Sequence, residues 1–130
     1  MTTEVTPFER MGGEPFFHDL VAAFYEGVAE DSVLRPLYPE EDLGPAERRL
    51  RMFLMQYWGG PKLYQEERGH PRLRLRHAPF RVDDEARRRW LLHMRAAYDR
   101  INVEYRLDKV TEAELWDYLE RAAQFMMNTE

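Results

Sequence analysis

Residues 70–80, which read HPRLRLRHAPF, combine histidine, arginine and proline in a way that suggests binding chemistry. Pro71 and Pro79 disfavour helical geometry at the residues before them, so we expect an extended lead-in and then about one helical turn that presents His77. A neutral imidazole is the commonest side-chain ligand for metals, and arginines suit acidic groups at the rim of a pocket. By itself, however, the pattern fits an ordinary half-buried histidine better than a metal ligand.

The composition limits the classes of protein that this chain can represent. Its 130 residues are 44% hydrophobic and 33% charged, which predicts one soluble globular domain over residues 1–130. A net charge of −5 argues against general nucleic-acid binding. The absence of cysteine excludes disulfides, zinc fingers, iron–sulfur clusters and thiol catalysis. With no signal-peptide pattern and no apolar run near the ~20 residues of a membrane span, we expect a cytoplasmic protein without stable membrane insertion.

The elements that must position residues 70–80 are predicted to be helices. A capping box at Thr6 and Glu9 predicts a short first helix, and Asp83 is the expected N-cap of a later one. Apolar residues recur at helical spacing over residues 14–29, after Pro45, from Asp83 to about Asn102, and after a capping box at residues 111–114. These stripes comprise Phe17, Leu20, Val21, Phe24, Val28, Leu50, Phe53, Leu54, Tyr57, Trp90, Met94, Ala97, Ile101, Leu115, Tyr118, Leu119, Ala122, Phe125 and Met126. With no convincing strand, the prediction is an all-α fold of four substantial and two short helices.

Short motifs follow one another along nearly the whole chain. They are Gly12-Gly13, Phe24-Tyr25, Val28–Asp31, Tyr38–Glu40, Arg49–Phe53, Gln56–Pro61, Arg68–Pro71 and Arg76–Phe80. Together, in this order and at these separations, they resemble the truncated haemoglobins, small globins whose helices form a two-over-two sandwich around haem. The chain looks most like their second group, the oxygen-binding class widespread in actinobacteria. The resemblance covers about residues 8–127 and implies haem b as the cofactor.

The resemblance also implies roles for individual residues. His77 would be the proximal ligand of the haem iron, while Tyr25, Tyr38 and Trp90 would line the distal side. An O2 ligand carries partial negative charge on its outer oxygen, and two phenols and an indole N–H can donate hydrogen bonds to it. Each of these three could instead be a core aromatic with a satisfied polar tip, and for Tyr38 or Trp90 taken alone this is the better explanation.

Further haem contacts are expected from apolar residues that extend the helical stripes and from polar residues near the propionates. The apolar set is Leu50, Phe53, Leu54, Leu75, Phe80, Val82 and Met94, and the propionate set is Arg49, Arg76 and Tyr64. Globins often carry a distal histidine where this chain has Ala46. Neither Ala46 nor Leu50 can donate a side-chain hydrogen bond, and the small Ala46 is expected to leave a path for ligand entry.

The predicted function is reversible binding of O2, CO and NO, with slow O2 release. One alternative is a haem enzyme, either a nitric-oxide dioxygenase or a peroxidase-like protein, which would need an external reductase because the sequence contains no reductase domain. Another is a cofactor-free helical bundle used in protein interaction. A di-iron bundle is disfavoured because the long helices contain no Glu-x-x-His pair. The residues leave open whether the protein forms a homo-oligomer.

Overall fold

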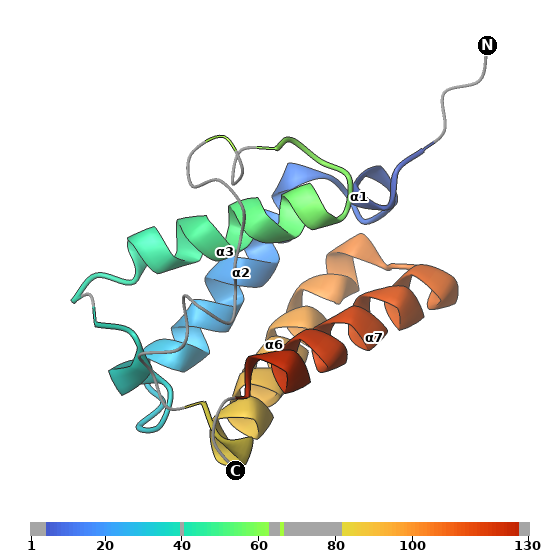
Figure 1. Ribbon diagram of the computed structural model, residues 1–130. Helices are drawn as coiled ribbons and strands as arrows, with labels where there is room; N and C mark the ends of the chain where they lie inside the picture. The colour runs from blue at the N-terminus through green and yellow to red at the C-terminus, as the bar shows by residue number, and fades with distance from the viewer. Residues whose placement is uncertain (1–4, 40, 63–65, 67–81, 128–130) are drawn as a thin grey trace.

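The structure is a computed structural model that describes residues 5–39, 41–62, 66 and 82–127 (Figure 1). All regular elements within these ranges are helical, as predicted. They are α1 (Pro7–Arg10), α2 (Glu14–Ala29), the 3-10 helix η1 (Arg35–Leu37), α3 (Gly44–Tyr57), α6 (Asp84–Tyr105) and α7 (Lys109–Met126). No helix in these ranges combines the length and apolar character that crossing a membrane requires.

Helices α1, α6 and α7 each begin at a side chain that accepts a hydrogen bond from a backbone N–H group. Thr6 Oγ1 accepts from the Glu9 amide at 3.2 Å, and Asp83 Oδ1 accepts from the Ala86 amide at 2.9 Å, which confirms both predicted starts. The predicted cap at Thr111 is wrong. The cap of α7 is Asp108, which accepts from the Thr111 amide at 2.8 Å and the Thr111 hydroxyl at 2.9 Å, so Thr111 lies inside the first turn.

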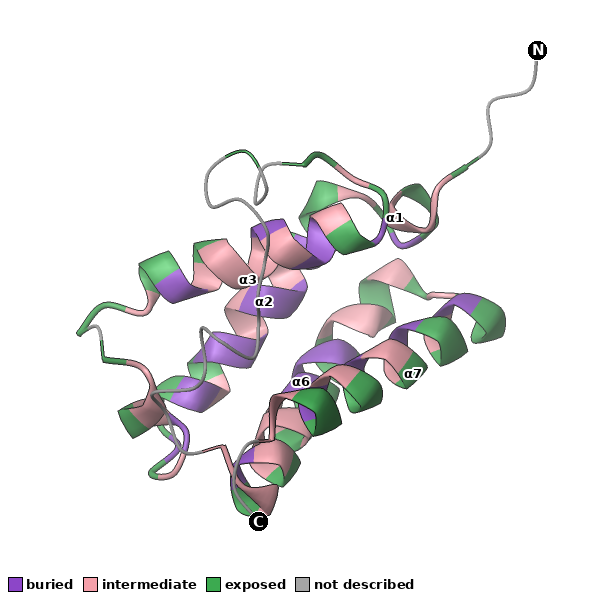
Figure 2. Ribbon diagram, in the orientation of Figure 1, coloured by how far each residue is buried: buried purple, intermediate pink, exposed green. Residues whose placement is uncertain are grey.

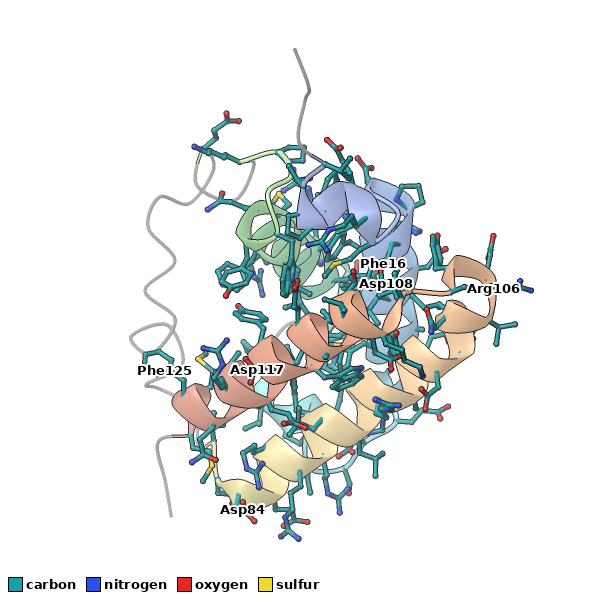
Figure 3. All side chains as sticks on the ribbon, turned by 90° about the vertical axis from the view of Figure 1, so that its right-hand side faces the viewer. Phe16, Asp84, Arg106, Asp108, Asp117 and Phe125 are labelled. Atoms are coloured by element: carbon teal, nitrogen blue, oxygen red, sulfur yellow. The ribbon has the colours of Figure 1, made fainter. Side chains whose placement is uncertain are left out.

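Helix α6 ends later than predicted. Helix α6 continues through Tyr105, about one turn beyond the expected end at Asn102, and closes with Arg106 in the left-handed conformation at φ 51°. Figure 3 places Arg106 and Asp108 at the turn from which α7 returns along α6. A sequence-based end at Asn102 failed because the side chain of Asn102 accepts from the Leu107 amide at 2.9 Å and so caps the turn from inside the helix.

Helix α2 is the centre of the packing, because it contacts both α3 and α6, while α6 also contacts α7. Figure 1 shows α6 and α7 as an adjacent pair beside the pair formed by α2 and α3. The predicted stripe on α2 is confirmed, and Figure 2 shows buried residues recurring along this helix. The fully buried aromatic side chains Phe16, Phe17 and Phe24 come from α2, and Tyr98 comes from α6.

The predicted core stripe on α3 is only partly correct. Leu54 is buried, but Leu50 and Phe53 are half-buried and Tyr57 is 49% exposed. Met52 and Met55 are buried instead. Apolar residues occupy two overlapping faces of α3, and spacing alone does not say which face meets α2. Phe125, predicted for the core, is likewise 54% exposed on α7.

Candidate functional site

Three of the predicted site residues meet in one aromatic cluster, which consists of Phe24, Tyr25, Tyr38 and Trp90. The ring centroids of Tyr25 and Tyr38 are 5.5 Å apart, and both contacts of Phe24 are edge-to-face, with Tyr25 at 5.0 Å and with Trp90 at 5.4 Å. The three donors come from α2, from the chain just after η1, and from α6. The fold therefore brings together side chains that lie up to 65 positions apart in sequence, as Tyr25 and Trp90 do.

The electrostatics of the aromatic cluster keep its central phenol neutral. Burial, the nearby Tyr38 and a hydrogen bond to Tyr38 raise the pKa of Tyr25 well above its usual value, and the positive charge of Arg49 offsets this only in part. A hydrogen bond that raises the pKa of a phenol favours the neutral, donating form. Tyr25 is therefore protonated at neutral pH and is hydrogen-bonded to Tyr38.

A buried carboxylate lies at the base of the corner that carries Tyr38. The side chain of Asp31 is 5% exposed. Its Oδ1 accepts from the amides of Val33 at 2.8 Å and Leu34 at 2.9 Å, as expected for a residue that caps a turn. Oδ1 also accepts from Arg89 Nη1 at 3.2 Å, and Oδ2 lies 2.7 Å from His93 Nε2. No role for His93 is predicted from the sequence, because no local pattern links it to Asp31.

These contacts fix the ionisation state of Asp31. Burial opposes its ionisation, but the hydrogen bonds from His93, Leu34 and Val33 and the charge of Arg89 outweigh burial and hold the pKa of Asp31 well below its usual value. An ionised carboxylate can only accept hydrogen bonds. It follows that His93 carries a proton on Nε2 and donates it to Asp31.

Helix α3 supplies most of the described candidates for haem packing. Ala46 and Leu54 are buried, whereas Arg49, Leu50 and Phe53 are half-buried on the same helix. Outside α3, Met94 on α6 is fully buried and Val82, just before α6, is half-buried. The remaining predicted site residues lie outside the described residues. They are His77, Tyr64, Leu75, Arg76 and Phe80.

The described part of the site has the chemistry that a porphyrin requires. Leu50, Phe53, Val82 and Trp90 present partly exposed apolar surface while also packing against the core. The neutral phenols of Tyr25 and Tyr38 add hydrogen-bond donors beside this surface. Within the described ranges, no group of three or more histidine, aspartate or glutamate side chains could hold a metal ion directly. The apolar surface and the phenol groups of the described residues thus fit the flat apolar face of a porphyrin.

Comparison with known proteins agrees with this geometry. The family model for bacterial-like globins matches residues 6–128. A group 2 truncated hemoglobin of Bacillus subtilis is 41% identical over 122 residues, which are 94% of this chain and 88% of the relative. The X-ray structure of a thermostable hemoglobin from the actinobacterium Thermobifida fusca has 59% identity and a TM-score of 0.89, and the match covers 96% of this chain and 98% of that one.

A second solved structure gives the same fold with a more distant sequence. The X-ray structure of a truncated oxygen-avid haemoglobin from Bacillus subtilis is 40% identical with a TM-score of 0.86, and the match covers 95% of this chain and 100% of that one. These agreements extend over nearly the full length of each protein. The chain therefore belongs to the bacterial-like globins and, among them, to the second group of truncated haemoglobins, which implies haem-based binding of O2.

Proposed function

We propose that this protein binds haem b through His77 and holds O2 beside a distal donor group formed by Tyr25, Tyr38 and Trp90, so that O2 is released slowly. The observation that carries the proposal is the direct contact between Tyr25 and Tyr38, with centroids 5.5 Å apart and a raised pKa at Tyr25. Haem supplies the iron that takes up a diatomic ligand reversibly. The protein would contribute His77 to hold the iron, together with the apolar walls and the distal donors.

The two tyrosines have different parts in this proposal. Tyr38 would donate to the O2 ligand, and its hydrogen bond with Tyr25, which raises the pKa of Tyr25, would hold the Tyr38 hydroxyl in place. Tyr25 supports Tyr38, since a hydroxyl that accepts one hydrogen bond becomes a better donor of the next. Trp90, whose ring centroid lies 5.4 Å from that of Phe24, would donate from the α6 side.

The proposed slow release has support from a relative. The Bacillus subtilis protein with 40% identity is described as oxygen-avid. Slow release suits chemistry on O2 better than bulk delivery, and repeated turnover would require electrons from an external reductase. We propose O2 retention as the primary function because the distal donors account for it without a further partner.

The test of cofactor and axial ligand is an absorption spectrum of the purified protein in the ferric, dithionite-reduced and CO-treated states. We expect a Soret band that shifts with CO and that is lost or strongly altered in His77→Ala. The matched control is His18→Ala, because the His18 side chain is 56% exposed and pairs only locally with Asp19 among the described residues. No Soret band after addition of hemin would overturn haem binding, and an unaltered band in His77→Ala would overturn the assigned ligand.

A further inference from the structure

We propose that Asp31, His93 and Arg89 are positioning residues for the distal donor Tyr38, an inference that rests on the proposed function. We call these three side chains the Asp31 bridge. They join the corner after α2 to the middle of α6, and they touch neither of the two tyrosines through any hydrogen bond described above. By holding the corner against α6, the Asp31 bridge would set how well the Tyr38 hydroxyl points toward a ligand.

Hydrogen bonds run without interruption from Asp31 to Tyr38. The backbone oxygen of Asp31 accepts from the Arg35 amide at 2.9 Å, and the Arg35 oxygen accepts from the Tyr38 amide at 3.1 Å. The Arg35 guanidinium also donates to the backbone oxygens of Tyr38 and Glu41, each at 2.9 Å. A displacement of Asp31 would therefore be passed to the backbone of Tyr38, because few torsions between them are free to absorb it.

The α6 end of the Asp31 bridge is continuous with the aromatic cluster. Arg89 and His93 flank Trp90 in sequence, and His93 lies one helical turn beyond it. Trp90 in turn contacts Phe24 at 5.4 Å. Arg89 is held from a second side by Glu85 at 3.1 Å, which fixes the guanidinium that faces Asp31. The bridge thus connects the two segments that carry Tyr38 and Trp90.

Gly27 on α2 makes the approach of His93 possible. A Cβ atom at Gly27 would lie 2.4 Å from His93 Nδ1, far inside any acceptable contact. Gly27 lies in the last turn of α2, which ends at Ala29. Glycine is required at this position, because only a residue without a side chain leaves room for the imidazole that reaches Asp31.

The experiment measures O2 dissociation and the C–O stretching band of the CO-bound holoprotein in Asp31→Asn, His93→Leu, His93→Gln and Gly27→Ala. We expect faster O2 release, by about threefold to tenfold, in Asp31→Asn, His93→Leu and Gly27→Ala, because one fully lost neutral hydrogen bond corresponds to about tenfold at most. The C–O band should move in the same three variants. His93→Gln should stay near wild type, since its amide can still donate to Asp31.

A matched control and a second genetic background separate positioning from general loss of stability. Glu112→Gln weakens the 2.7 Å bond from Tyr98 to Glu112, which also joins α6 to another element, and it should leave O2 release and the C–O band unchanged. In a Tyr38→Phe background, Asp31→Asn should add nothing further. A urea unfolding curve for each variant shows which effects follow stability alone.

Three outcomes would overturn the inference. The first is unchanged O2 release and C–O band in Asp31→Asn and Gly27→Ala. The second is an equal acceleration by Asp31→Asn with or without the Tyr38 hydroxyl. The third is an effect of Glu112→Gln as large as that of Asp31→Asn. If Tyr38→Phe alone leaves O2 release unchanged, the role of Tyr38 in the proposed function is wrong. If Tyr38→Phe speeds release but Asp31→Asn and Gly27→Ala do not, only the inference about the Asp31 bridge is wrong.

Discussion

The two distal tyrosines lead to a prediction about coupling. If Tyr25 acts through Tyr38, then Tyr38→Phe should speed O2 dissociation and Tyr25→Phe should do so by less. A hydrogen bond is worth about 0.5–1.5 kcal/mol net, so Tyr38→Phe corresponds to about twofold to tenfold faster release at 1.4 kcal/mol per decade. Tyr25 is only 6% exposed, so its loss leaves the Tyr38 oxygen without its donor in a place that water enters poorly.

The decisive comparison is the double variant, measured by stopped-flow displacement of O2 with CO. Because both hydroxyls belong to one chain of hydrogen bonds, Tyr25→Phe should add little once Tyr38 is phenylalanine, and the two effects should not sum. Tyr98→Phe is the control, since it also removes a buried phenol that donates a bond, here to Glu112 at 2.7 Å. Additive effects of Tyr25→Phe and Tyr38→Phe would show that Tyr25 donates to the ligand directly and would refute the proposed order.

Two further predictions concern acid stability and ligand entry. Because the pKa of Asp31 is held below its usual 3.8, the stability that it contributes is fully present above about pH 5 and falls as pH drops below 3.8. Urea unfolding between about pH 5 and 2 should therefore show that Asp31→Asn loses less stability on acidification than the wild type does. An unchanged dependence of stability on pH in Asp31→Asn would contradict this. Ala46 is buried near the start of α3, so Ala46→Leu should slow CO association after flash photolysis, and an unchanged rate would remove the proposed entry path.

The fold was largely predictable because its signals are local. The stripe on α2 and the caps at Thr6 and Asp83 depend on residues within a few positions of one another, and all three are confirmed. The cap of α7 was misassigned because Asp108 and Thr111, three residues apart, are both residue types that cap helices well. Choosing between them requires the backbone conformation of Asp108, which is extended at φ −68° and ψ 162°.

The site was predictable in part. The convergence of Tyr25, Tyr38 and Trp90 followed from the family resemblance, because no local pattern joins an aromatic on α2 to one on α6. The Asp31–His93 contact spans 62 positions and carried no local signal beyond Gly27, a half-buried glycine in the last turn of α2. A glycine at such a position marks a close approach by another element, but it does not say which one.

The anchoring of α3 has a mechanical consequence for the pocket. At its C-terminal end Tyr57 stacks on Tyr118 at 3.9 Å, Trp58 packs edge-on to Tyr118 at 5.6 Å, and the Trp58 oxygen accepts from the Phe8 amide at 2.8 Å. Fourteen residues at 1.5 Å each make α3 about 20 Å long. If α3 pivots about its C-terminal end, a tilt of about 5° displaces its first turn, which carries Ala46, by roughly 2 Å.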